Sequence, residues 1–116
     1  MIYPITPVPK PRMTQRDKWA KRPCVERYRS FKDLIRLNKV ILPTAGWHVV
    51  FHMPMPESWP SSKKAIFSGK GHIQRPDLDN LGKALFDAIY DNDSCIWDIR
   101  LTKRWAYEGS IEIVPL

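Results

Sequence analysis

An acidic segment stands out in this basic chain. The run RPDLDNLGKALFDAIYDNDS, residues 75–94, carries five aspartates in seventeen positions, while the whole chain has a formal net charge of +7. Carboxylates this close together repel one another unless a counter-charge separates them, and Lys83 supplies just one. Mg²⁺ would supply the rest, because it takes oxygen ligands and is normally held by a few carboxylates, with places left for water and a phosphate oxygen.

A helix is expected to position most of this segment. Six apolar residues recur at three- and four-residue steps and predict a helix of three to four turns that begins near residue 77 or 78: Leu78, Leu81, Ala84, Leu85, Ala88 and Ile89. Asp79, Lys83 and Asp87 follow at four-residue steps and are expected to share the opposite face. Asp77 lies at the start of the helix and Asp93 in the turn after it, so the two meet only if the next strand packs beside the helix.

Each aspartate also has an ordinary structural interpretation. Asp77 after a proline suits an N-cap, Asp79 in the first turn suits the helix dipole and pairs with Lys83, and residues 91–94 have ordinary turn composition. These interpretations hold singly, but together they do not explain why so many carboxylates gather.

Other chemistries agree less well with the sequence. A calcium-binding loop that starts at Asp77 would need oxygen ligands where Leu81 and Ala88 stand. His48 and His52 lie four residues apart on an expected strand, a span of about 13 Å, so they cannot hold one zinc ion together and are interpreted as strand-face residues. The chain has no GxSxG motif and no phosphate-binding glycine-rich loop. Phosphodiester hydrolysis needs neither, because metal-bound water attacks while a cation and a lysine stabilise the developing charge.

The basic charge is concentrated in one third of the chain. Residues 10–39 hold eleven Lys or Arg against three Asp or Glu, a balance of +8, so the other residues sum to −1. Such a patch indicates a polyanionic partner, most simply nucleic acid.

No membrane partner and no organic cofactor are expected, because no stretch reaches the about 20 apolar residues of a membrane span and no cofactor motif is present. The absence of a signal peptide predicts a cytoplasmic protein, in which Cys24 and Cys95 are reduced thiols.

The length and the apolar pattern predict one domain, residues 1–116, of class α/β (α+β). A strand interrupted by prolines is expected at 2–9, a basic amphipathic helix at 26–40 and a strand at 47–55. The acidic helix and two further strands complete the order β-α-β-α-β-β, and the last two strands are expected to pair as a hairpin through the YEGS turn. Residues 56–76 are expected to form a long, basic, flexible loop.

The stretch RPDLDNLGKALFDAIYDNDSCIWDIRLTK resembles the core signature of the RusA family of Holliday junction resolvases. In that signature a helix with the pattern D-x-D-N-x-x-K-x-x-x-D is followed by an acidic turn and a strand. The agreement is good over residues 75–104. Upstream of them it is looser, and there the chain resembles phage and prophage members of the family.

The resemblance assigns roles to individual residues. Carried over one by one, the metal-binding and catalytic aspartates of the family fall on Asp77, Asp79 and Asp93, and its catalytic lysine falls on Lys83. The short link IYDND leaves the third aspartate open between Asp91 and Asp93. Asp93 is preferred because SCIWDIR then registers with the strand of the family, and Asp87 takes a supporting role.

The resemblance also implies a small mixed β-sheet with two helices, a homodimer, and Mg²⁺ as cofactor with Mn²⁺ as a substitute. A four-way junction has an approximate two-fold axis and needs paired cuts, so a two-fold dimer suits it. We therefore predict a Mg²⁺-dependent endodeoxyribonuclease that resolves Holliday junctions in recombination and repair. The alternatives are a less selective nuclease on flaps or Y-forks and a non-catalytic DNA-binding module, and the intact set of carboxylates and lysine argues against the module.

Seven basic residues are expected to contact phosphates: Lys10, Arg12, Arg16, Lys63, Lys64, Lys70 and Arg75. Their charge would make the affinity for DNA fall as salt rises. Trp59 and Phe67, in the expected loop, either stack on an opened base or pack the loop against the body of the protein, and packing is the favoured alternative.

Overall fold

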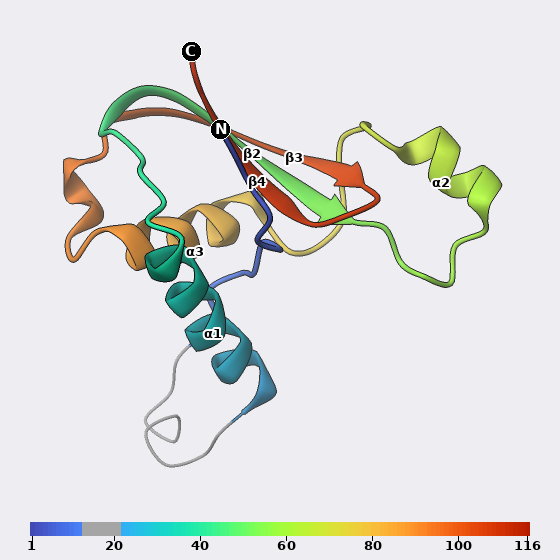
Figure 1. The fold of residues 1–116 in the computed structure, drawn as a ribbon, viewed down its shortest axis with the longest axis horizontal. Coiled ribbons are helices and arrows are strands. Elements are labelled where there is room, and N and C mark those ends of the chain that lie inside the picture. Colours follow the sequence, from blue (N-terminus) through green and yellow to red (C-terminus); the bar gives the residue numbers. More distant parts are fainter. Residues whose placement is uncertain (13–21) are drawn as a thin grey trace.

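A computed structural model describes residues 1–12 and 22–116 (Figure 1). Within these residues four strands form one mixed sheet in the order β1-β4-β2-β3, and helices cover it or extend from it. The elements follow the chain as β1 Ile2–Tyr3, α1 Pro23–Leu37, β2 Ala45–Pro54, α2 Ser61–Phe67, α3 Leu78–Ile89, the 3-10 helix η2 Asp93–Cys95, β3 Asp98–Ala106 and β4 Ser110–Pro115.

Strand β2 holds the sheet together. It pairs in parallel with β3 along its whole length, from Ala45 opposite Asp98 to Pro54 opposite Ala106, and antiparallel with β4 on its other side. β1 then pairs antiparallel with the outer edge of β4. Because parallel neighbours cannot be joined by a tight turn, the segment between β2 and β3 is a crossover connection, and it contains both α2 and α3. The predicted mixed sheet is confirmed.

The core lies between one face of the sheet and the helices α1 and α3. Successive strand residues point to opposite faces, so Val49, Phe51 and Met53 of β2 point toward the helices and are buried there. Both helices turn a stripe of apolar residues with helical spacing toward this face. The buried members of the stripes are Tyr28, Phe31 and Ile35 on α1 and Leu81, Ala84, Leu85 and Ala88 on α3. Helix α3 is thereby fixed on both sides, by the sheet and by α1.

The two histidines of β2 lie on the opposite face of the sheet, as the strand-face interpretation predicts. Nε2 of His48 lies 2.8 Å from Oγ1 of Thr102 on β3, and Nε2 of His52 lies 3.1 Å from Oε1 of Glu112 on β4. Burial, with Arg100 nearby, lowers the pKa of His48, which favours its neutral form. The two histidine rings therefore contact different neighbouring strands, β3 and β4.

Several predictions about the elements are wrong. The order contains an additional helix, α2, and is β-α-β-α-α-β-β. The strand expected at 2–9 is limited to β1, because Pro4, Pro7 and Pro9 have no N–H to donate to a ladder. β3 and β4 do not form a hairpin, since β2 lies between them. The link from Ala106 to Ser110 is long enough to pass the end of β2, because two strand spacings amount to only about 10 Å.

The segment expected as a long loop, 56–76, is folded around α2 and attached to β3. The backbone N–H of Gly69 donates to the carbonyl of Trp105, whose own N–H donates to the carbonyl of Lys70. The ring of Trp59 packs at a tilt against Trp105, with centroids 4.8 Å apart, and against Phe67, with centroids 5.4 Å apart. The packing alternative is confirmed for Trp59, whereas the ring contact of Phe67 is with Trp59 in the same segment. α2 itself stands away from α1 and α3 (Figure 1) and buries none of its residues.

Two smaller expectations concern the cysteines and the membrane. Cys24 and Cys95 are both free thiols, as predicted. None of the helices in the described residues is long and apolar enough to cross a membrane.

Candidate active site

The start of α3 presents a carboxylate that no local bond uses. Asp77 is the N-cap residue, and its carbonyl accepts the first helical hydrogen bond from the N–H of Leu81 at 3.2 Å. Its side chain makes no capping hydrogen bond, so the N-cap interpretation accounts for its backbone only. The preceding turn is held from β3, where Nζ of Lys103 donates to the carbonyl oxygens of Gln74 and, at 2.7 Å, Pro76. The sheet therefore fixes where Asp77 stands.

Asp79, Lys83 and Asp93 line one open cavity of about 440 Å³ beside α3. Oδ2 of Asp79 lies 3.8 Å from Nζ of Lys83, and these side chains are 69% and 59% exposed. An ion pair this exposed contributes little to stability, so it leaves both groups available to a ligand. The structure thus brings together three of the four residues predicted for catalysis.

The turn that carries Asp93 is stabilised by a neighbouring residue. Asn92 precedes η2 and accepts the backbone N–H of Ser94 on its Oδ1 at 3.1 Å. Asp93 contributes its backbone carbonyl, which accepts from the N–H of Ile96 at 3.1 Å. Its carboxylate is exposed and lines the cavity, whereas Asp91 is not among the residues that line it.

Two further cavities surround the first turn of α3 and gather basic residues from distant segments. One, of about 550 Å³, is lined by Lys10, Arg75 and Asp77, and the other, of about 320 Å³, by Lys10, Arg12 and Lys83. Asn80 lines both, and its carbonyl accepts the backbone N–H of Lys10 at 3.2 Å. The N-terminal segment is therefore fastened to α3 beside the carboxylates.

The other basic residues predicted to bind DNA lie elsewhere or cannot be placed. Lys63 and Lys64 belong to α2, and Lys70 follows it. Nζ of Lys63 lies 4.0 Å from the centroid of the Trp59 ring, a cation–π contact within the segment around α2. Arg16 lies outside the described residues.

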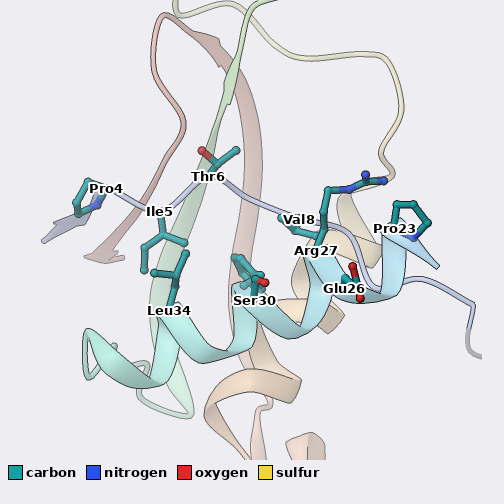
Figure 2. Close-up of a pocket in the computed structure, with 10 residues that line it drawn as sticks. Pro4, Ile5, Thr6, Val8, Pro23, Glu26, Arg27, Ser30 and Leu34 are labelled. Carbon is teal, nitrogen blue, oxygen red and sulfur yellow. The ribbon is translucent and has the colours of Figure 1, made fainter. Parts of the chain in front are cut away.

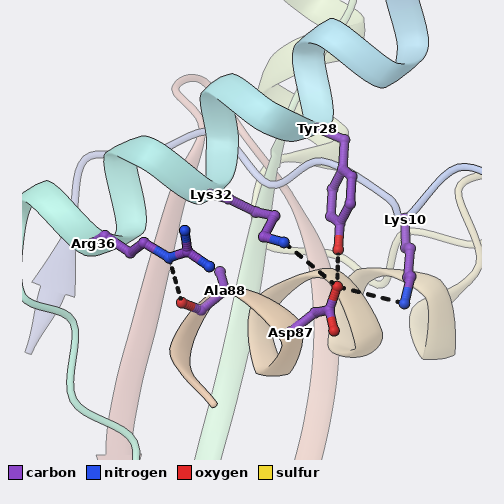
Figure 3. A network of polar contacts seen from close by, with 6 residues as sticks. All are labelled: Lys10, Tyr28, Lys32, Arg36, Asp87 and Ala88. Atoms are coloured by element: carbon purple, nitrogen blue, oxygen red, sulfur yellow. Dashed lines mark hydrogen bonds and ion pairs between the residues drawn. The ribbon is translucent and has the colours of Figure 1, made fainter. Parts of the chain in front are cut away.

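Asp87 belongs to a separate polar network that joins α3 to α1 (Figure 3). Its Oδ2 accepts a short hydrogen bond from the hydroxyl of Tyr28 and lies 3.4 Å from Nζ of Lys10 and 3.7 Å from Nζ of Lys32. The hydrogen bond from Tyr28 lowers the pKa of Asp87, and the two lysines act in the same direction. Burial, with the same contact, raises the pKa of Tyr28 well above its ordinary value. Asp87 therefore contacts α1 and does not line the cavity of Asp79, Lys83 and Asp93.

The donor atoms at the main cavity suit Mg²⁺, but the described residues do not close a complete site. Asp79 and Asp93 offer hard oxygen ligands in the open, and Mg²⁺ is often held by one or two carboxylates together with waters and substrate phosphates. Among residues 1–12 and 22–116, no three His, Cys, Asp or Glu side chains are grouped closely enough to hold a metal ion. Asp77, the third predicted ligand, lines the neighbouring cavity.

A cavity of about 490 Å³ between α1 and residues 4–8 is a poor alternative site (Figure 2). Apolar side chains such as Ile5, Val8 and Leu34 form much of its wall. Its charged residues, Glu26 and Arg27, are neighbours of opposite sign on α1. It offers no pair of carboxylates for metal-assisted hydrolysis.

Sequence reasoning missed two residues of the site. Lys103 falls on the same face of β3 as Ile99 and Leu101, which pack against the core. Because a lysine on such a face is seldom buried without a hydrogen-bond acceptor, its position could have indicated one, which is the turn before Asp77. Trp97 lines the main cavity and is 75% exposed. The sequence offered no signal for Trp97, because an aromatic residue next to a strand is ordinarily packed.

A mixed α+β fold with open carboxylates and a lysine at one cavity, bordered by basic residues, suits an enzyme that cleaves phosphodiesters. The family described as endodeoxyribonuclease RusA matches residues 4–114, so the chain belongs to this family. The chain is also 30% identical over 87 residues to the Uncharacterized protein YqaN of Bacillus subtilis (strain 168), across 68% of this chain and 61% of that protein. It therefore spans less than two thirds of the length of that relative. No solved structure matches the chain.

Proposed function

We propose that this protein is a Mg²⁺-dependent endodeoxyribonuclease that resolves four-way DNA junctions by paired, symmetric phosphodiester hydrolysis. One observation carries the proposal: Asp79, Lys83 and Asp93, which come from a helix and from the turn after it, line the same open cavity. Family membership supports the reaction class. The selectivity for junctions and the identity of the ion, with Mn²⁺ as a substitute, are parts of the proposal.

The residues take distinct roles. Asp79 and Asp93 would hold the ion, with Asp77 as the third ligand, because its carboxylate makes no capping bond and lies two positions from Asp79. When bound, the ion supplies positive charge and Lewis acidity to the phosphodiester. Lys83, which is exposed and lines the cavity, would donate hydrogen bonds to a phosphate oxygen and stabilise the charge that develops there.

The basic residues around the first turn of α3 would hold the phosphates next to the one that is cut. Lys10 and Arg12 line a cavity with Lys83, and Arg75 lines another with Asp77. We propose that residues 1–116 act as one domain in which Lys63, Lys64 and Lys70, in the basic segment 56–76, contact a second part of the same branched substrate. Two copies of the chain, related by a two-fold axis, would make the paired cuts.

Single asparagine substitutions of the aspartates test the site. Asp79→Asn and Asp93→Asn are expected to reduce the single-turnover cleavage rate of a four-way junction by about 100-fold or more, because the lost charge stabilisation amounts to several kcal/mol and each 1.36 kcal/mol is tenfold. Asp91→Asn is the matched control, an exposed aspartate of the same turn, and should cleave as the wild type does. Binding of the junction by Asp79→Asn in EDTA should be equal or tighter, since repulsion of phosphate falls. Equal cleavage by all four proteins would refute the proposed site.

Substrate comparison tests the selectivity. The wild type is expected to cut a four-way junction symmetrically in Mg²⁺ or Mn²⁺ and to leave linear duplex intact, with cleavage absent in EDTA. Equal cutting of flaps, Y-forks and junctions would indicate a less selective branched-DNA nuclease. Binding without any cutting would indicate a non-catalytic module. Sedimentation of the free protein measures whether two copies associate, and a monomer bound to a junction would contradict the paired-cut proposal.

A further inference from the structure

Trp97 is an exposed tryptophan with a fixed backbone. Its N–H donates to the carbonyl of Thr44 at 3.1 Å, directly before β3 begins, while its side chain is 75% exposed. In the described part of the chain its ring stacks on no other aromatic ring and lies beneath no cation. Single exposed apolar residues are common on proteins, so the position of this one decides whether it has a role.

The cavity that Trp97 lines has a charged side and an apolar side. Asp79, Lys83 and Asp93 supply the charges, and the apolar wall is formed by Phe86, Ile96, Ile99 and Leu101. A nucleotide has the same division, since it carries an anionic phosphate and a flat base with apolar faces. A phosphate that contacts Lys83 would place a neighbouring base beside the indole ring of Trp97, provided that the base is not stacked within a duplex.

Two other tryptophans that might stack on a base, Trp59 and Trp105, are already packed. Trp59 lies between Phe67 and Trp105, and Lys63 covers its ring at 4.0 Å. Trp105 is itself only 5% exposed. Of the tryptophans in the described residues, Trp97 is the one that offers an open ring, and it does so at the cavity with the proposed catalytic groups.

The geometry points to Trp97 as a base-stacking residue, on which an unpaired base of branched DNA rests next to the phosphate that is cut. The inference rests on the proposed function and adds to it the residue that selects opened over fully stacked DNA. Stacking on an aromatic ring tolerates any base, because every base has a π face. Trp97 would therefore favour a branch point without reading its sequence.

Binding to a junction that contains 2-aminopurine next to the branch point tests the inference directly. In EDTA the wild type should change the 2-aminopurine fluorescence, Trp97→Ala should lose this change, and Trp97→Phe should keep part of it. Trp97→Ala should bind the junction roughly 5- to 140-fold more weakly, the range that loss of one base stack gives. Tyr107→Ala is the matched control, because Tyr107 is 60% exposed in the turn after β3 and does not line the cavity. It should behave as the wild type does.

The outcomes separate this inference from the proposed function. A wild type that neither binds nor cuts branched DNA contradicts the proposed function. A wild type that cuts junctions, together with a Trp97→Ala protein of equal affinity and equal fluorescence response, overturns the role of Trp97 alone. Circular dichroism and sedimentation of the free variants complete the test. If Trp97→Ala changes the oligomeric state, Trp97 lies between two copies of the chain and the stacking role is refuted.

Discussion

Replacing Tyr28 by phenylalanine removes one of the contacts that fasten α3 to α1. The Tyr28 hydroxyl is the donor to Asp87 from a side chain that is only 4% exposed, so the change removes one hydrogen bond to a carboxylate and leaves the buried ring in place (Figure 3). Hydrogen bonds to charged groups contribute about 1.5–3 kcal/mol. We expect a loss near the lower end, about 1.5–2 kcal/mol, because the Asp87 side chain is 37% exposed and water can replace part of the contact.

Thermal unfolding measures the effect. An unfolding entropy of about 2.1 cal/mol/K per residue gives ~0.24 kcal/mol/K for a chain of 116 residues, so Tyr28→Phe should lower Tm by about 6–8 °C. The control Tyr107→Phe, at an exposed tyrosine, should stay within about 0.5 kcal/mol of the wild type. In a double-mutant cycle with Asp87→Asn, the coupling energy should reach about 1 kcal/mol or more. Strictly additive losses would refute the contact.

The difference between wild type and Tyr28→Phe should also depend on pH. The hydrogen bond from Tyr28 lowers the pKa of Asp87 below its ordinary value near 3.8, so the stabilisation is complete above that value and is lost as pH falls through the lower, folded-state pKa. Burial raises the pKa of Tyr28 above its ordinary 10.0, so the same difference declines again as pH rises beyond about 10. Unfolding in urea at several pH values checks both limits, and a difference that is constant from pH 3 to 7 would contradict the assignment.

Two further predictions concern a tight approach and the phosphate contacts. Gly109→Ala should destabilise the protein by about 1–3 kcal/mol in thermal unfolding, because its Cβ would lie 2.9 Å from the Cα of Thr6, whereas Gly71→Ala meets nothing within 4 Å and should be near neutral. Equal stability of the two variants would contradict the close approach. Lys70→Ala and Arg75→Ala should each reduce the slope of log affinity against log salt for junction DNA by about 0.9, measured by fluorescence anisotropy, and an unchanged slope would exclude a phosphate contact.

The acidic helix was predictable because several independent signals agree on it. Its apolar stripe has helical spacing over twelve residues, and Pro76 and the N-cap residue Asp77 precede its first residue, Leu78, so both the type and the beginning of α3 follow from the sequence. A pattern this long leaves little room for another local structure. The positions of Asp79 and Lys83 on the open side of α3 then follow from the geometry of the helix.

The neighbours of a strand are harder to predict than the strand itself. The YEGS turn specifies that the chain reverses between β3 and β4, but it does not specify that the two strands pair. β2 lies between them and is buried on both faces at its centre: Val49 and Phe51 are buried against the helices, and Val50 is 5% exposed on the other side. The three consecutive apolar residues Val49, Val50 and Phe51 suit a central strand, and their burial on both faces outweighs the turn.

The packing state of individual side chains is the part that sequence alone did not determine. Trp59 lies in a segment rich in proline, serine and lysine, which favours an open loop, yet it packs against Trp105 of β3. Trp97 lies beside a strand, where a packed ring is the ordinary case, yet it is exposed. Both results depend on how segments distant in the sequence pack together, and local sequence patterns do not predict this packing.

Helical geometry explains why residues at one spacing have two different roles. An α-helix turns by about 100° per residue, so each four-residue step advances by about 40°, and the eight residues from Asp79 to Asp87 accumulate about 80°. This rotation carries Asp87 from the open cavity of Asp79 to the side that faces α1, where Tyr28 meets it. Asp79→Asn should therefore slow cleavage by about 100-fold or more while leaving Tm nearly unchanged, and Asp87→Asn should lower Tm while a folded variant still cuts. The identical four-residue spacing thus places one carboxylate where a substrate can reach it and the other where it holds two helices together.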